Sequence, residues 1–115
     1  MPNAFSYDIS PEDSRIQKED WFSLDKTIFS KYRNILVCGN PPFGQQNKLA
    51  IEFFNEAAKF CNVIAFILPL SFKKKSIQDR LNLNFWLEKE IDLIDGYFFL
   101  KDETKINVPC VFQIW

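Results

Sequence analysis

The sequence predicts an α/β fold, with a mostly parallel sheet and a C-terminal antiparallel hairpin. Strands are predicted at Asn34–Cys38 and Val63–Leu68, where the continuous apolar runs Ile35–Cys38 and Val63–Leu68 are typical of strands covered on both faces. Between them, residues 47–60 carry apolar side chains at three- and four-residue steps, which predicts a helix with one buried face. A strand, a helix and a strand in succession indicate a parallel pair joined by a right-handed crossover.

The segments before this unit are short. Ala4–Ile9 alternates and is rich in aromatic residues, which predicts a short strand. Ile16–Phe22 predicts a second short strand. Ser23 is a suitable helix cap, and a short helix is expected over Lys26–Tyr32.

The C-terminal part is expected to hold two short helices, Lys73–Leu81 and Phe85–Ile91, followed by two strands. The strands are Gly96–Leu100 and Val108–Trp115, and the polar segment Lys101–Asn107 joins them as a loop. This connection is too short for a helical crossover, so the two strands should form an antiparallel hairpin at one end of the sheet.

Composition limits the possible functions. The 115 residues are 47% hydrophobic and 25% charged, which is enough for one domain with a real core. The net charge of −1 provides no overall basic field, so any nucleic-acid contact needs a local patch or a partner. No apolar run reaches the length of a membrane span, so no membrane association is expected.

Histidine is absent and the cysteines are Cys38, Cys61 and Cys110. The lack of histidine excludes Ser-His and Cys-His catalysis. The odd number and wide spacing of the cysteines fit neither a disulfide framework nor a zinc site, and no metal is expected. Unpaired buried cysteines are typical of the reducing cytosol, which predicts a cytoplasmic protein.

Asn40-Pro41-Pro42-Phe43 follows the first apolar strand, at the sheet edge where open α/β sheets bind ligands. This sequence suits chemistry on an exocyclic amino group, whose lone pair is released when both N–H bonds find acceptors. The side-chain oxygen of Asn40 and the carbonyl of Pro41 are such acceptors, and two successive prolines fix the backbone. Phe43 offers a stacking face for a base, and Gly44 permits close approach of a substrate. The alternative is a plain strand-to-helix turn.

An Asn-Pro-Pro-Phe loop after a hydrophobic strand is similar to the catalytic loop of S-adenosylmethionine-dependent amino-methyltransferases. These are Rossmann-like enzymes that methylate adenine N6 in DNA or RNA. The resemblance implies S-adenosylmethionine as cofactor and direct in-line transfer of its methyl group to the amino nitrogen. It implies Asn40, Pro41, Pro42 and Phe43 as the catalytic residues, with Asn40 also at the cofactor.

The resemblance extends to the cofactor-binding elements. Tyr7-Asp8-Ile9 looks like the end of that family's second strand, which implies that Asp8 binds the ribose hydroxyls and that Ile9 packs on the adenine. Asp20-Trp21-Phe22 looks like the next element. There Asp20 would accept from the adenine amino group and Trp21 would lie against the ring. A solvated turn residue is the alternative for each aspartate.

The substrate side is matched by two later segments. Ile67–Phe72 looks like the fifth strand and the loop after it, and Val108–Trp115 resembles the seventh strand of bacterial and phage DNA adenine methyltransferase-like proteins. Lys73-Lys74-Lys75 follows that loop and could contact phosphates, or could be a solvated helix start. The substrate-binding residues are therefore expected to be Phe43, Gly44, Ser71, Phe72, Lys73 and Lys74, with DNA favoured over RNA as the nucleic acid.

The chain departs from this family at the first strand and its glycine-rich turn. No glycine precedes Asp8, so the sequence resembles a single partial domain, residues 1–115, that runs from the second strand to the seventh. A second polypeptide could supply the strand and turn, through a protein partner or self-association. The chain could instead be an inactive remnant or binding subunit. Or the sheet could close the gap and bring Asp8, Asp20 and Asn40 together. Related loops also act on guanine amino groups and on glutamine.

Overall fold

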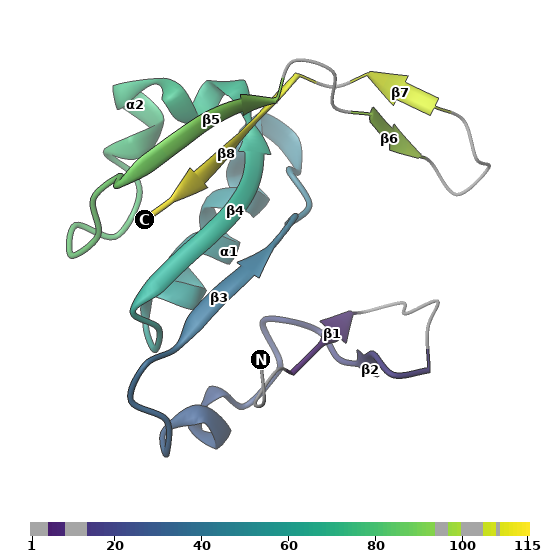
Figure 1. Cartoon of the computed structure of the whole chain (residues 1–115), viewed down its shortest axis with the longest axis vertical. Coiled ribbons are helices and arrows are strands. Elements are labelled where there is room, and N and C mark those ends of the chain that lie inside the picture. The colour runs from purple at the N-terminus through teal and green to yellow at the C-terminus, as the bar shows by residue number, and fades with distance from the viewer. Residues whose placement is uncertain (1–4, 9–13, 94–96, 100–104, 108) are drawn as a thin grey trace. The chain divides into compact units, whose positions relative to one another are not determined.

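The computed structural model of this chain describes residues 5–8, 14–93, 97–99, 105–107 and 109–115, with the backbone alone for 97–99 and 105–107. These residues belong to two compact units, Met1–Tyr32 and Arg33–Trp115, which are described one after the other. Figure 1 shows the elements of both units along the chain.

The first unit contains a small parallel strand pair. Strand β1 (Tyr7–Asp8) lies beside β2 (Gln17–Lys18), with Tyr7 opposite Gln17 and Asp8 opposite Lys18. The pairing continues at both ends, because Gln17 N–H donates to the Ser6 carbonyl at 2.9 Å and Glu19 N–H donates to the Asp8 carbonyl at 2.8 Å. Both predicted N-terminal strands are therefore present, at shorter length than expected.

A 3-10 helix, η1 (Lys26–Phe29), takes the place of the longer helix predicted over Lys26–Tyr32. Its cap is Asp25 and not Ser23, because the Asp25 carboxylate accepts from the Thr27 N–H at 3.0 Å and from the Thr27 hydroxyl at 2.7 Å. These bonds hold the pKa of Asp25 below its usual value. Edge-to-face and tilted ring contacts at 5.8–6.1 Å fill the small core of this unit, and they join Phe5, Tyr7, Phe29 and Tyr32.

The second unit is built on a four-stranded sheet of order β3-β4-β8-β5. Strand β3 (Leu36–Gly39) runs parallel to β4 (Val63–Pro69), and β8 (Cys110–Ile114) lies antiparallel between β4 and β5 (Lys89–Leu93). It follows that β3, β4 and β5 all run in one direction. The predicted fold class is confirmed: the chain is an α/β protein whose parallel and antiparallel strands are consistent with an incomplete Rossmann-like fold.

The helix predicted over Phe85–Ile91 is wrong. Residues 85–88 are not helical, and β5 begins at Lys89. Polar and apolar residues alternate from Glu90 to Leu93, and the backbone of β5 pairs with β8, where Ile91 lies opposite Phe112. In this segment, the two-residue alternation of side chains and the pairing with β8 favour a strand more strongly than the weak three- and four-residue spacing favours a helix.

The C-terminal hairpin also differs from the expectation. Strand β6 (Tyr97–Phe99) pairs antiparallel with β7 (Lys105–Asn107), a segment that was expected to be loop. The final strand β8 does not pair with β6 but inserts between β4 and β5. An antiparallel hairpin is therefore present in this region, but β6 and β7 form it, and β8 belongs to the four-stranded sheet.

Helices cover one face of this sheet. Helix α1 (Lys48–Ala58) confirms the helix predicted between the two apolar strands, and the 3-10 helix η3 (Leu70–Lys73) and α2 (Lys75–Gln78) follow β4. Phe54 of α1 is fully buried, with its ring 6.4 Å from Phe66 of β4 and 5.3 Å from Trp115. Figure 1 shows α1 and α2 on the far side of the sheet. None of the helices in the described ranges has the length and apolar character that a membrane span requires.

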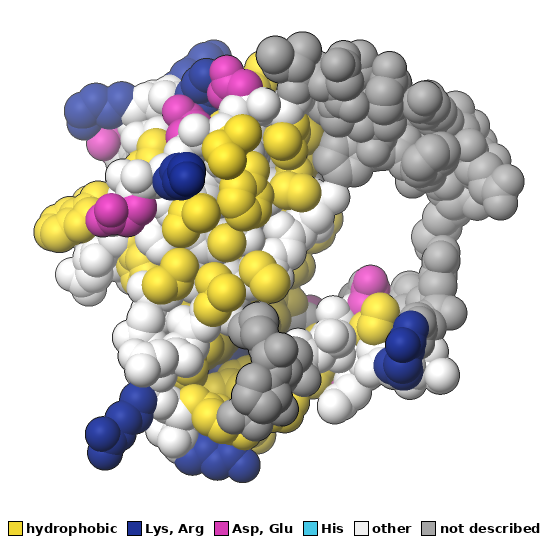
Figure 2. All heavy atoms as spheres, in the orientation of Figure 1, with side chains coloured by type: hydrophobic (Ala, Val, Ile, Leu, Met, Phe, Trp, Pro, Cys, Tyr) yellow, Lys and Arg dark blue, Asp and Glu magenta, His cyan; other side chains and the backbone are white. Residues whose placement is uncertain are grey.

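The opposite face of the sheet carries apolar side chains that reach solvent. Leu36, Val63 and Ile91 are 44%, 38% and 46% exposed. The strand register places these three side chains on one face with those of their neighbours, which we call the open sheet face. Figure 2 shows hydrophobic side chains spread over this side of the sheet. The apolar members of the open sheet face are Leu36, Cys38, Val63, Ala65, Ile67, Pro69, Ile91, Leu93, Phe112, Ile114 and Cys110, the last of which is buried.

Candidate functional site

The predicted catalytic loop, Asn40–Phe43, begins where β3 ends at Gly39. Pro41 is buried and Phe43 is half-buried, while Asn40 is exposed to solvent. The Phe43 carbonyl accepts a hydrogen bond from the Ala50 N–H of α1 at 3.3 Å. The loop is therefore anchored at Pro41 and Phe43, and the amide of Asn40 is presented at the edge of the sheet.

A left-handed turn connects this loop to α1. Gly44 has φ 70° and ψ −173°, a conformation that is essentially restricted to glycine, and Gln46 and Asn47 also have positive φ values of 53° and 62°. A Cβ atom added at Gly44 would lie 2.6 Å from the Cβ of Leu49. The structure thus requires glycine here for the approach of the loop to α1. The predicted approach of a substrate to Gly44 stays a prediction.

The loop after β4 lies at the same edge of the sheet, because β3 and β4 are parallel. This loop is η3, and its Ser71 hydroxyl accepts a hydrogen bond from the side-chain amide of Asn47. Asn47 directly precedes α1, so the bond joins the connection after the catalytic loop to the loop that the sequence assigns to the substrate side. The structure brings these two predicted segments together.

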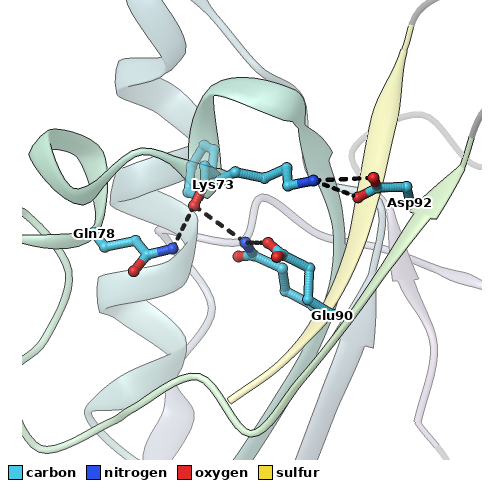
Figure 3. Close-up of polar contacts among 6 residues, drawn as sticks. Lys73, Gln78, Glu90 and Asp92 are labelled. Atoms are coloured by element: carbon cyan, nitrogen blue, oxygen red, sulfur yellow. Dashed lines mark hydrogen bonds and ion pairs between the residues drawn. The ribbon is translucent and has the colours of Figure 1, made fainter.

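The other predicted substrate residues differ in exposure. The Phe72 side chain is fully buried, whereas Lys74 is exposed. The Lys73 ammonium forms an ion pair with both oxygens of Asp92, at 2.8 and 2.9 Å, and this pairing raises the pKa of Lys73 (Figure 3). Lys75 pairs with Asp79 at 2.8 Å. Contact of Lys73 and Lys74 with phosphate stays a prediction.

The predicted cofactor residues belong to the first unit. Asp8 ends β1 and is exposed, and Asp20 comes two residues after the end of β2 and is also exposed. Because β1 and β2 are parallel, both carboxylates follow the same end of the strand pair. One oxygen of Asp20 accepts from the Phe22 N–H at 3.0 Å. Ile9 lies outside the described residues.

Trp21, the predicted stacking partner of the cofactor adenine, is half-buried in the turn after β2. The Lys26 ammonium donates to the Trp21 carbonyl and lies 5.0 Å from the centroid of the indole ring. This is cation–π geometry, so one face of the ring is next to a positive charge. A stacked adenine would have to use the other face or displace Lys26.

S-adenosylmethionine places two demands on a protein. Its ribose hydroxyls and adenine amino group are donors, which the exposed carboxylates of Asp8 and Asp20 can accept. Its methionine part needs close backbone approach at glycine. Of the glycines in the described ranges, Gly44 approaches Leu49, and a Cβ added at Gly39 would meet nothing within 4 Å. The described residues thus offer acceptors suited to the donors of the adenosine half, and neither Gly39 nor Gly44 forms a cradle for the methionine half.

A comparison with protein families bears on these observations. The family model of the EDM2 methyltransferase-like domain matches residues 3–111. The chain belongs to this family. Searches of curated proteins and of solved structures found no significant match. The match to this family model confirms the prediction that the chain belongs to a methyltransferase family. The matched residues extend over both units, from β1 into β8. Adenine, S-adenosylmethionine and the role of Asn40–Phe43 stay predictions.

Sequence reasoning did not single out three residues that hold this site together: Asn47, Asp92 and Gln113. Asn47 and Asp92 bind the loop after β4 directly, and Gln113 binds it from β8. A signal was present for Gln113, since it is a lone amide inside the apolar run of β8. Asn47 and Asp92 are ordinary polar residues of a helix start and an edge strand, and nothing in their sequence context distinguishes them.

Proposed function

We propose that this chain is a S-adenosylmethionine-dependent methyltransferase subunit that acts on the exocyclic amino group of adenine in nucleic acid, preferentially DNA. The observation that carries the proposal is the loop Asn40–Phe43, which follows a parallel strand and combines an exposed amide at Asn40 with a buried Pro41. Membership of a methyltransferase-like family supports it. So does the loop after β4, which is joined to this region through Ser71 and Asn47.

The residues of the loop act on the acceptor base. The bound cofactor supplies an electrophilic methyl group. Asn40 accepts one amino N–H of adenine through its side-chain oxygen, and the Pro41 carbonyl accepts the other, so that the nitrogen lone pair is directed away from the ring. Phe43 stacks on the base and excludes water from one of its faces. Positioning and preorganised acceptors therefore account for most of the rate enhancement.

The cofactor is held in part by the first unit. Asp8 accepts from the ribose hydroxyls and Asp20 accepts from the adenine amino group, while Ile9 and Trp21 contact the adenine ring. Both aspartates are exposed at the same end of the β1–β2 pair, which supports this assignment. The sequence resemblance also assigns Asn40, in the second unit, to the cofactor.

A protein partner completes the cofactor site. Within the described part of the chain, β3 pairs with β4 alone, and Leu36 of β3 is 44% exposed. Parallel sheets are normally covered on both faces, and an unpaired edge accepts a further strand. The partner is therefore a polypeptide that adds a strand beside β3, covers the open sheet face and carries the glycine-rich turn.

Three free cysteines, of which Cys38 is exposed, support a reducing compartment, and we assign the chain to the cytoplasm. Lys73 and Lys74 are both exposed, and Lys73 is paired with Asp92, so we assign Lys74 to a phosphate of the nucleic acid. With a net charge of −1, such contacts must be local.

Calorimetry with S-adenosylmethionine tests the need for a partner. The purified chain alone should not bind the cofactor with micromolar affinity, because the glycines of the described ranges offer the methionine half no cradle. Micromolar binding by the chain alone, lost in Asp8→Ala, would sink the partner requirement while it supported the assignment of Asp8.

Methyl transfer tests the catalytic loop. The tagged chain, isolated from its native cells with its bound partners, should methylate adenine in duplex DNA. Asn40→Ala should lower kcat about a hundredfold, the cost typical of losing one preorganised hydrogen bond to the reacting group. Glu52→Ala, an exposed change on α1, is the matched control and should leave the rate unchanged. Transfer that survives both Asn40→Ala and Phe43→Ala would refute the assigned loop.

A further inference from the structure

Gln113 is a buried polar residue near the end of β8. It is 0% exposed, and its side-chain amide makes three hydrogen bonds. Nε2 donates to the Phe72 carbonyl at 3.1 Å and to Oε1 of Glu90 at 2.8 Å, and Oε1 accepts from the indole N–H of Trp115 at 2.9 Å. Both N–H donors of the amide are used. Since a buried amide is costly without such partners, these bonds fix the orientation of the side chain.

The Phe72 carbonyl is the point at which this network reaches the loop after β4. It also accepts from Nε2 of Gln78 in α2, at 2.8 Å. The next residue, Lys73, pairs with Asp92 of β5. Figure 3 shows these contacts converging on η3. Two consecutive residues of the loop are therefore held from three separate elements, α2, β5 and β8.

The preceding residue carries the connection further. Ser71 accepts from the side chain of Asn47, which lies between the catalytic loop and α1. The carbonyl of Ser71 also accepts from the Lys74 N–H at 3.0 Å, which closes the turn of η3. A continuous path of hydrogen bonds and backbone thus runs from Gln113 through Phe72 and Ser71 to Asn47.

We propose that Gln113 is a positioning residue that holds the loop Ser71–Lys74 in the place where it receives the nucleic-acid substrate. The proposal rests on the proposed function for its link to substrate. A residue needed only to fill the core could be any apolar side chain of similar length, such as methionine. Such a side chain would leave the Phe72 carbonyl with one of its two side-chain donors and would remove the hydrogen bond between the loop and Gln113 of β8.

Hydrogen exchange of the whole chain tests the positioning role without any assay of activity. In Gln113→Met, exchange of the backbone N–H of Lys74 should become about five- to tenfold faster, as expected for loss of one hydrogen bond that restrains local opening. Trp115→Phe is the control, because it removes the donor to Oε1 and leaves both bonds from Nε2. Its Lys74 exchange should match that of the wild type.

Unchanged exchange at Lys74 in Gln113→Met, or an equal increase in Trp115→Phe, would overturn the proposal. If Gln113→Met does not fold, Gln78→Met replaces it, since Gln78 donates to the same carbonyl from a half-buried position. The expected increase and the overturning result are the same.

The link to substrate is tested by the kinetics of the native assembly. Gln113→Met should raise KM for DNA about five- to tenfold and change kcat less, because a misplaced loop weakens acceptor binding. A fall in kcat with unchanged KM would overturn this link. If the wild-type assembly transfers no methyl group, the proposed function fails, and the exchange experiment still decides whether Gln113 positions the loop.

Discussion

Gly44→Ala should destabilise the second unit by about 3 kcal/mol, through two costs that the structure shows separately. Gly44 has φ 70° and ψ −173°. Placing a non-glycine residue in that region costs about 1–3 kcal/mol. The new methyl group would also lie 2.6 Å from the Cβ and 3.1 Å from the N of Leu49, at the start of α1. Forcing an extra carbon into such a contact typically costs about 1–3 kcal/mol.

Urea unfolding followed by circular dichroism measures this change, read from the midpoint at constant m-value. Gly39→Ala is the matched control, because a Cβ there meets nothing within 4 Å and the residue has no positive φ. Its stability should change by less than about 1 kcal/mol. Equal midpoints for Gly44→Ala and Gly39→Ala would refute the reasoning, since the two variants differ in the strain and contact described.

Three further outcomes are expected. Gln46→Gly should stabilise the chain by about 1 kcal/mol in the same urea assay, because Gln46 has φ 53° and left-handed backbone is unfavourable for a side chain; a loss of stability would contradict this. Iodoacetamide at pH 8 should label exposed Cys38 well before Cys61. Burial raises the pKa of Cys61 to about 11, so this side chain stays a thiol, which is far less reactive than a thiolate. Equal labelling rates would show that Cys61 is accessible. Lys74→Ala should weaken DNA binding by the native assembly and reduce the salt slope by about 0.9, the value for one phosphate contact; an unchanged slope would remove Lys74 from the interface.

The central part of the fold could be predicted from sequence because its signals are local. The apolar runs of β3 and β4 and the helical spacing of α1 each extend over several residues, and the loop between them follows directly. The helix predicted over Phe85–Ile91 was wrong because the structure of this segment depends on a strand that is distant in the sequence. Ile91 is placed by pairing with Phe112, and such pairing is visible only once the sheet is assembled.

The same distinction applies to the candidate site. The loop Asn40–Phe43 can be proposed from sequence because four adjacent residues carry the chemistry assigned to it. The residues that hold the loop after β4 could not be found from sequence. Gln113 and Phe72 are 41 positions apart, and Lys73 and Asp92 are 19 positions apart. The structural requirement at Gly44 was also hidden, since it arises from the packing of one loop on the start of α1.

The most direct test of the proposed reaction is the identity of the methylated product. The tagged chain, isolated with its partners from native cells, is incubated with labelled S-adenosylmethionine and duplex DNA, and the digested nucleosides are separated and analysed by mass spectrometry. Labelled N6-methyladenine is the expected product, and Asn40→Ala should abolish it. Label on guanine or on protein, absence of labelled adenine, or methyladenine that persists in Asn40→Ala would contradict the proposed reaction.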